Sequence, residues 1–410
     1  MNDLKRTLTP LRGAALMLNI VVGAGLLALP GLVIDAVGDH ALWSWIMCAT
    51  ASFPLLLVFI IMGRRYPHAG GIAHFARMSF GDSGFIIGSL IFLGAVAFGL
   101  PAIALTGGFY LAESYGGSPT VYAVGLVVLA CVSHLFSSEV AAGISTFVAS
   151  TIILTLVALF IIGISGVDWD SAREQTVSIS QMRLATSLMP FMMIFFAFTG
   201  WEVAAGLSEE FRNPSRDFPR AMLLSFAVAI MLYLCMAFVA QNAVGTITPE
   251  AVFVHTAERA FGQYGRLGIS MLAGVIILAN LHGAIWAVSR MVYSLGREGH
   301  LPFVLNVNSR GTPVSSVGLT TAVILAVLMG DGMQLFDIQD MLSIAGQNFL
   351  ILYGIAGISL FRLSPSKIEK TIAVIAILLT AALAIFEGPS LLYPLCLAGA
   401  GWLVFRISAR

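Results

Sequence analysis

The stretch GAGLLALPG, residues 23–31, interrupts a long apolar run that begins with LRGAALMLNIVV and continues with LVIDAV. The run is long enough to cross a bilayer as one helix. Gly23, Gly25 and Pro30 oppose a continuous helix, because glycine destabilises a helix interior and proline removes a backbone hydrogen bond. The sequence therefore predicts a membrane helix that is broken near its middle.

The rest of the chain has the composition of a polytopic membrane protein. Its 410 residues are 58% hydrophobic and 10% charged, whereas a soluble domain carries about 25% charged residues. Apolar runs of membrane-spanning length recur without the alternation of a barrel strand. We expect an all-α protein with about twelve transmembrane helices, at residues 12–37, 42–63, 84–112, 120–136, 141–165, 188–209, 219–243, 266–295, 314–330, 337–361, 370–386 and 389–406.

The basic residues predict the orientation. Of the 21 Lys and Arg residues, all but Arg173, Arg183, Arg259 and Arg266 fall on the side that holds the N-terminus. Cytoplasmic loops are the basic ones, so both termini are expected in the cytoplasm. Two outer segments, 167–185 and 248–262, have helical character, and Thr248 is placed to cap a helix that starts at Pro249.

Other classes of site receive no support from the sequence. The four cysteines, Cys48, Cys131, Cys235 and Cys396, are scattered through apolar runs and form no C-x-x-C pair, so we expect neither a metal site nor a disulfide framework. The zero net charge gives no indication of nucleic-acid binding. Gly23, Gly25 and Ala28 match a dinucleotide fingerprint, but that motif requires a soluble βαβ unit. No cofactor is expected.

A second break is predicted in PFMMIFFAFTGWEVAAGLSEE, residues 190–210, where Thr199 and Gly200 precede Trp201. It lies five spans after the first, and an odd number of spans inverts a repeat in the membrane. Paired breaks at matching positions of two halves indicate a transporter's binding site. The N–H groups that start the second half of span 1 suit a carboxylate, and the C=O groups that end the first half of span 6 suit an ammonium.

Four motifs resemble those of the amino acid–polyamine–organocation (APC) transporters. GAGLLALP is similar to their span-1 signature, FFAFTGWE to their span-6 motif, and YPHAGG and EEFRNPSRDFPRA to two inner-loop motifs. AGGIAHFARMSFG and SEEFRNPSRDFPRAM are most similar to members that export methionine and branched-chain amino acids. The resemblance implies one transporter domain over 1–410 that works by alternating access, with inverted five-helix repeats at about 12–165 and 188–361 and two extra helices at about 370–406.

The same resemblance implies a set of substrate-binding residues: Val22, Gly23, Ala24, Gly25, Phe196, Ala197, Phe198 and Thr199. Phe196 matches the position of an aromatic gate over the substrate, and Trp201 is the second expected gating residue. Ala24 departs from the family pattern because it lacks a hydroxyl. Backbone N–H groups must therefore do more of the carboxylate binding.

Two ionisable residues in the spans are candidates for proton coupling. An intramembrane ionisable residue is a functional hypothesis by default. Glu202 lies just past the second break, where apolar surroundings favour the protonated carboxyl, and proton-responsive relatives carry Glu at the matching position. The alternative is a Glu that braces the half-helix. His282 is the weaker candidate, since a lone membrane histidine is more often a structural hydrogen-bonding group.

The pocket chemistry favours neutral, apolar amino acids. Aromatic and methionine side chains surround the second break without a spare basic residue: Phe195, Phe196, Phe198, Trp201, Met192 and Met193. A charged substrate side chain would be costly to bury there without a partner. On the inner side, Arg64, Arg65 and Arg77 either pair with Glu209, Glu210 or Asp217 as a gate or are membrane-flanking charges.

The sequence thus predicts a secondary transporter in the inner membrane, and not an enzyme. Its expected substrates are methionine, leucine, isoleucine and valine, its expected coupling partner is the proton, and its direction, taken from the resemblance, is export by antiport. The alternatives are a proton- or sodium-coupled importer, an amino acid exchanger, and an ion channel, although no selectivity ring is visible. The oligomeric state stays open.

Overall fold

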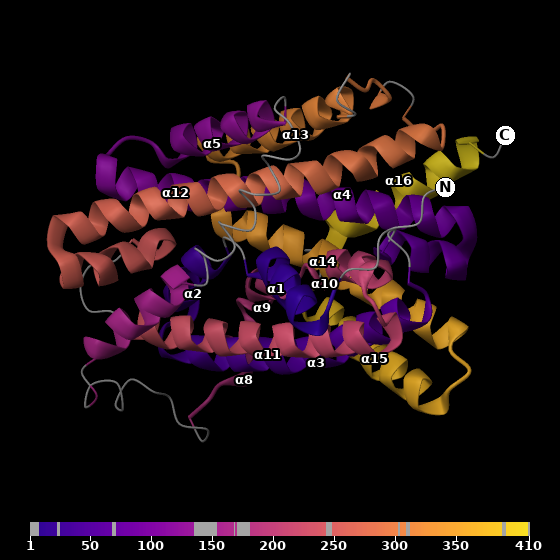
Figure 1. Cartoon of the computed structure of the whole chain (residues 1–410), viewed down its shortest axis with the longest axis horizontal. Coiled ribbons are helices and arrows are strands. Elements are labelled where there is room, and N and C mark those ends of the chain that lie inside the picture. The colour runs from indigo at the N-terminus through magenta and orange to yellow at the C-terminus, as the bar shows by residue number, and fades with distance from the viewer. Residues whose placement is uncertain are drawn as a thin grey trace.

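The computed structural model describes residues 8–22, 25–67, 71–134, 154–167, 169, 181–242, 248–301, 304–308, 312–387 and 391–408, and these residues are almost entirely helical (Figure 1). Within them there is no strand, only an isolated bridge between Leu8 and Phe211. An all-helical architecture is the expected outcome where apolar segments must satisfy their own backbone in lipid. The predicted fold class is confirmed.

The first half of the chain contains the broken first span and four further apolar helices. Its elements are α1 (Pro10–Val21), α2 (Gly25–Val37), η1 (Gly38–His40), α3 (Ala41–Arg65), α4 (Gly71–Tyr115), α5 (Pro119–Ser133) and a helix over Leu154–Ser165. Residues 141–153 of the fifth predicted span lie outside the described residues.

The second half begins with short helices and continues with long ones. Its elements are α8 (Leu184–Leu188), α9 (Phe191–Ala197), α10 (Trp201–Ala205), η2 (Gly206–Glu210), α11 (Pro214–Gln241), η3 (Pro249–Ala251), α12 (Val252–Arg297), α13 (Val314–Gly332), α14 (Ile338–Leu363), α15 (Lys367–Glu387) and α16 (Leu392–Ser408). The span predicted at 188–209 thus consists of three short helical pieces, α9, α10 and η2, rather than one helix with a single break.

Glycines with positive φ bend two of the longest helices. Gly81 in α4 has φ 70° and Gly262 in α12 has φ 58°, a conformation that side chains with a Cβ rarely adopt. Each glycine separates a shorter polar-flanked helix from the membrane-spanning part. The outer helix predicted at 248–262 is therefore present as η3 and the first turns of α12.

Among the described residues, seven helical stretches are long and apolar enough to cross a membrane, and four shorter apolar helices accompany them. The count of about twelve spans and the inverted repeat stay predictions. The outer segment 167–185 lies mostly outside the described residues.

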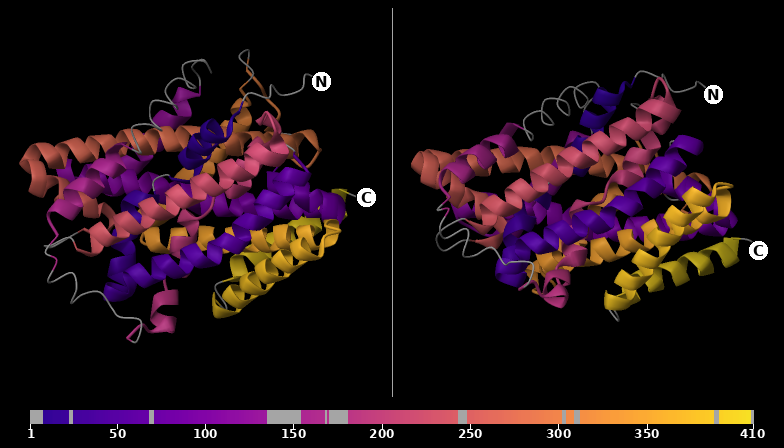
Figure 2. Two further views of the ribbon diagram at one scale, coloured as in Figure 1. Left: turned by 60° about the horizontal axis from the view of Figure 1, so that its bottom comes forward. Right: turned by 90° about the horizontal axis from the view of Figure 1, so that it is seen from below.

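The short helices of the two breaks lie inside a ring of long ones. α9 contacts α2, α3 and α14, and α14 also packs along α4. α15 and α16 lie at the edge of the molecule (Figure 2). We call the end of the bundle where α3 ends and α15 begins the terminal end, because α16 also ends there (Figure 1), and the opposite end the distal end.

Candidate functional site

A cavity of about 450 Å³ lies where the two broken spans meet. Eight helices contribute its walls: α1, α2, α4, α9, α10, α11, α12 and α14. Its lining is mostly aliphatic and aromatic, with Phe92, Val96, Ile103, Phe196 and Phe349 among the larger side chains. Glu202 is the only acidic or basic residue among the described residues that line it. This size and character are typical of a small-molecule site.

The first break separates α1 from α2. Val22 ends α1 with φ −81° and ψ 79°, and its N–H bonds Leu18 O at 2.7 Å. α2 begins at Gly25, while Gly23 and Ala24 lie outside the described residues. A Cβ added at Gly25 would lie 3.8 Å from the Ala197 Cβ, so the start of α2 faces the end of α9 directly.

The second break separates α9 from α10. The Thr199 hydroxyl donates to Phe196 O at 2.7 Å, which satisfies a carbonyl at the end of α9. Gly200 then turns the chain with φ 102°, which a glycine adopts without strain, and α10 begins at Trp201. Both predicted interruptions are therefore present, and the ends of two half-helices face the same cavity.

Tyr233 of α11 joins the two breaks, a role that no local sequence pattern indicates. Its hydroxyl is 2.7 Å from Ala197 O and 3.2 Å from Val21 O. These carbonyls belong to the last residues of α9 and α1, which have no intrahelical partner. The ring packs against Trp45 and Phe198. One side chain thus holds the end of each first half-helix at the cavity wall.

Glu202 is 3% exposed and accepts hydrogen bonds only from neutral donors. Both of its carboxyl oxygens lie 3.0 Å from the Gly200 N–H, and Oε2 accepts from the Tyr353 hydroxyl at 2.7 Å. Tyr353 comes from α14 and is fixed by edge contacts with Phe59 and Phe195. Within the described residues no ion pair reaches this carboxyl.

Some of the predicted site residues line the cavity, and others do not. The lining includes Gly25, Phe196, Ala197, Thr199 and Glu202. The other predicted residues with described positions, Val22, Phe198, Trp201 and His282, are not among its lining residues. Phe198 and Trp201 both pack on Phe226 of α11 instead.

His282 lies on a different face of α12. Its Nδ1 is 2.5 Å from the Ser133 hydroxyl of α5, and its ring stacks on His134 with centroids 4.2 Å apart. These contacts join α12 to α5 and leave His282 away from the cavity.

The cavity is covered on the distal side. Residues 26–33 of α2 are all buried, and η3 packs on them. The approach is so close that a Cβ at Gly31 would lie 2.0 Å from Pro249 O. Glycine is required at Gly31 because a larger residue would displace η3 from α2.

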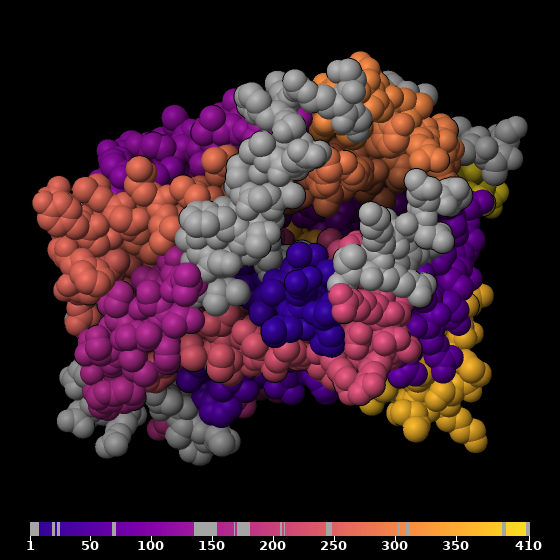
Figure 3. All heavy atoms as spheres, in the orientation of Figure 1, coloured from indigo at the N-terminus to yellow at the C-terminus, as the bar shows by residue number. Residues whose placement is uncertain are grey.

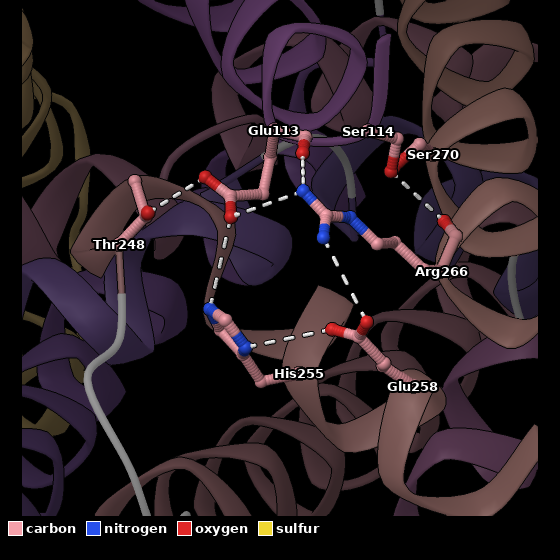
Figure 4. A network of polar contacts seen from close by, with 7 residues as sticks. All are labelled: Glu113, Ser114, Thr248, His255, Glu258, Arg266 and Ser270. Carbon is pink, nitrogen blue, oxygen red and sulfur yellow. Dashed lines mark hydrogen bonds and ion pairs between the residues drawn. The ribbon is translucent and has the colours of Figure 1, made fainter. Parts of the chain in front are cut away.

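We call residues 26–33 of α2, together with η3, the distal cover. A polar network joins this cover to α4 (Figure 4). The Thr248 hydroxyl donates to Glu113 Oε2 at 2.7 Å, so Thr248 does not cap η3 with its side chain as the sequence predicted. His255 and Arg266 each lie 3.8 Å from Glu113 Oε1. Both side chains also approach Glu258, at 3.8 and 3.7 Å.

On the terminal side the cavity extends along α1 to Leu16, which is 42% exposed. In the space-filling view the face that carries α1 is hollowed beside this helix (Figure 3). At this end, the chain just before α1 pairs with the segment after α10. The Leu8 N–H donates to Glu210 O at 3.0 Å, and the Arg212 N–H donates to Leu8 O at 3.1 Å. The Phe211 ring occupies the space that a side chain at Gly13 would need.

The basic residues at the terminal end have partners other than those that the sequence suggested. Arg65 pairs with Glu369 of α15 at 3.0 Å. Arg77 pairs with Asp82 at 3.0 Å and also with Glu298, the residue that follows α12. Asp217 is in none of the described ion pairs, and the side chain of Glu209 lies outside the described residues. The gate that the sequence suggested stays a prediction.

Comparison with known proteins agrees with this architecture. The model of the family described as "Amino acid permease" matches residues 8–404. YecA, an uncharacterised amino acid permease of Bacillus subtilis (strain 168), is 29% identical and covers 98% of this chain and 96% of its own. The L-methionine/branched-chain amino acid exporter YjeH of Escherichia coli (strain K12) is 27% identical, with 98% and 97% covered.

A third relative has a different transport mode in its name. The serine/threonine exchanger SteT of Bacillus subtilis (strain 168) is 24% identical and covers 80% of this chain and 77% of its own. The family match spans nearly the whole chain, including both breaks and the cavity between them. The chain belongs to the amino acid permease family of the APC superfamily, and it is a multi-pass membrane transporter rather than an enzyme.

Proposed function

We propose that this protein exports neutral, apolar amino acids, such as methionine, leucine, isoleucine and valine, from the cytoplasm by alternating access in exchange for protons. The observation that carries the proposal is the cavity between the two breaks, whose described lining is mostly apolar and has Glu202 as its one ionisable carboxyl or basic group. An aliphatic side chain gains by leaving water for such a lining, whereas a charged one loses.

The half-helix ends suit the two charges of the substrate backbone. The first N–H groups of α2 have no intrahelical partner and face a carboxylate favourably. The Phe196 carbonyl already accepts the Thr199 hydroxyl and the Thr199 N–H. The Ala197 carbonyl, which ends α9, accepts the Tyr233 hydroxyl and has a second lone pair for an ammonium. The substrate side chain then lies among Phe92, Val96 and Phe349.

Glu202 is assigned to proton exchange rather than to substrate binding. Its oxygens already accept hydrogen bonds from Gly200 and Tyr353, so a substrate cation would have to displace one of these donors. A buried carboxyl without a cationic partner can change its charge without breaking an ion pair. We keep His282 as a weaker coupling candidate, since its contacts are with α5.

The direction rests on resemblance, because the exporter YjeH is similar over nearly the whole chain. The cavity extends towards the terminal end. With both termini in the cytoplasm of a bacterial inner membrane, as the basic residues predict, that end would admit cytoplasmic substrate, in a state that importers and exporters share. The exchanger SteT makes amino acid exchange the second candidate.

Flux in proteoliposomes tests the proposal. The purified protein is reconstituted with labelled leucine or methionine, and flux is measured with and without an imposed pH gradient for the parent, Glu202→Gln and Asp331→Asn. Asp331 is the matched control because it also accepts a hydroxyl hydrogen bond, from Thr120 at 2.8 Å, but lies on α13 away from the cavity.

Three results discriminate the candidates. Gradient-driven flux in the parent and the control, with only gradient-independent exchange left in Glu202→Gln, supports proton coupling through Glu202. Gradient-driven flux that survives in Glu202→Gln rejects this residue as the coupling site. Exchange without any response to the gradient in the parent favours the exchanger.

A further inference from the structure

A second cavity, of about 630 Å³, lies between α14, α15 and α16 at the distal end. It shares no lining residue with the first cavity. Gln347 and Phe349 of α14 show the separation, since Gln347 lines the second cavity and Phe349 lines the first. The proposed transport cycle does not use this second space.

A buried amide in the second cavity lacks a hydrogen-bond donor. Gln347 is 3% exposed, and its Nε2 donates to Glu387 Oε2 at 3.1 Å. Its Oε1 is buried and accepts nothing from the described residues. A buried acceptor without a donor costs about 1–3 kcal/mol. The geometry therefore leaves a place for a donor in the cavity beside Gln347.

The charges around the cavity have one sign. Glu387 ends α15, and Asp340 lies in the first turn of α14, where one of its oxygens accepts the Asp337 N–H at 3.3 Å. No Lys, Arg or His is among the described lining residues, and no described ion pair involves either carboxyl. A cationic donor would complement both the carboxylates and the free amide oxygen.

We propose that this cavity binds a primary ammonium group. Such a group carries three N–H donors and no acceptor, which matches Glu387 and the Gln347 Oε1. The carbon attached to the nitrogen would lie against Ile344 and the Tyr393 ring. A trimethylated ammonium has no N–H and cannot satisfy the amide oxygen, so the site distinguishes primary from quaternary amines.

A bare metal ion fits the cavity less well. Calcium takes 6–8 oxygen ligands in close contact, whereas the lining offers two carboxyl groups on separate helices, each with one oxygen already hydrogen-bonded. The volume also exceeds what one ion fills.

The primary ammonium group could belong to either of two kinds of molecule. One is the headgroup of an aminophospholipid, because the surrounding parts of α15 and α16 present apolar side chains outward: Ile385 is 81% exposed and Leu392 is 68% exposed. The other is a free amine such as an amino acid. Both offer the same group to the same acceptors, and an experiment with the full-length protein separates them.

Cys396 supplies the readout, because it lines the cavity and is exposed. In a Cys131→Ser, Cys235→Ser background the remaining Cys48 is buried, so alkylation by N-ethylmaleimide reports Cys396. The alkylation rate is measured in nanodiscs of phosphatidylcholine, with and without phosphatidylethanolamine at about one lipid in three. In a second series, ethanolamine, leucine, choline, sodium or calcium is added to the nanodiscs of pure phosphatidylcholine.

Slower alkylation with phosphatidylethanolamine identifies a lipid headgroup, and slower alkylation with ethanolamine or leucine identifies a soluble amine. Choline should have no effect. Glu387→Gln and Gln347→Leu should each weaken the protection roughly tenfold, as expected for one charge-assisted hydrogen bond, whereas Asp331→Asn should not. Protection by choline or a metal ion alone, no protection by any amine, or protection unchanged in Glu387→Gln would overturn the proposal.

Discussion

Tyr233 has a function that only the folded chain makes visible. Its hydroxyl lies at the ends of α1 and α9 together, within reach of Val21 O and Ala197 O. Tyr233→Phe keeps the ring contacts and removes the donor from two carbonyls. We expect about a tenfold loss of apparent leucine or methionine affinity, because one lost hydrogen bond of about 1.4 kcal/mol corresponds to that factor.

Equilibrium counterflow in proteoliposomes measures this effect. Tyr264→Phe is the control, since Tyr264 is 87% exposed. Affinity equal to that of the parent in Tyr233→Phe would show that the hydroxyl does not position the half-helices.

Single residues could be predicted from the sequence only where the signal was local. Gly25, Phe196, Thr199 and Glu202 stand beside recognisable breaks, and the structure places all four at the cavity. Tyr233 and Tyr353 were missed because their partners are backbone or carboxyl oxygens far away in the chain. The sequence around a tyrosine in an apolar run does not show whether its hydroxyl bridges two other segments or makes no such contact.

The contact between η3 and α2 makes a prediction about the distal cover. Gly31→Ala places a methyl group 2.0 Å from Pro249 O, so η3 must move away. Overpacking of this kind costs about 1–3 kcal/mol, which would shift the population towards states open at the distal end by roughly 5- to 150-fold. An impermeant thiol reagent on that side should then alkylate Ile103→Cys, a cavity position, faster in Gly31→Ala.

Gly318→Ala is the control for this assay, because nothing lies within 4 Å of a Cβ added at Gly318. Equal labelling in Gly31→Ala and the control would mean that η3 does not limit access.

The network of Figure 4 offers an independent way to loosen the same cover. Thr248→Val keeps the shape of the side chain and removes the donor to Glu113 Oε2. A smaller rise in labelling of Ile103→Cys, about fivefold, is expected for the loss of one hydrogen bond. Thr371→Val, which removes a hydroxyl bonded within α15, should leave the rate unchanged. A rate in Thr248→Val equal to that control would remove Thr248 from the cover.

Helices were easier to predict than their interruptions and ends. Long apolar runs fixed the positions of α3, α11 and α14 to within a few residues, because hydrophobicity must match the bilayer along a whole span. The interruption of the span predicted at 188–209 was placed correctly at Thr199 and Gly200, but the further short helix η2 was not predicted, since hydropathy does not register a change in backbone direction. Gly81 and Gly262 mark the other two bends, but their positive φ follows from packing that the local sequence does not encode.

At the terminal end, an ion pair connects α15, one of the two helices at the edge of the molecule, to α3. Arg65 of α3 contacts Glu369 of α15 at 3.0 Å, and the Ser364 hydroxyl donates to the same carboxyl at 2.6 Å. Glu369→Gln should lower the free energy of unfolding by about 1–3 kcal/mol, because Arg65 loses its charged partner. Thermal unfolding in detergent should show this as a lower midpoint, with flux per folded molecule unchanged.

Lys367→Gln provides the comparison, since Lys367 is exposed at the start of the same helix. A midpoint for Glu369→Gln equal to that of Lys367→Gln would mean that the ion pair adds no stability. The sequence placed Arg65 on the inner side, as a gate residue or as a membrane-flanking charge, but it did not predict the partner Glu369, which lies about 300 residues further along the chain.

The backbone bonds of Leu8 to Glu210 and Arg212 have a kinetic consequence. We expect them to move α1 and the segment after α10 as one unit, although Leu8 and Glu210 lie far apart in the sequence. Opening and closing at the terminal end would then follow one activation barrier instead of two successive ones. The time course of a conformational signal reported from either half-helix should accordingly be a single exponential with the same rate constant.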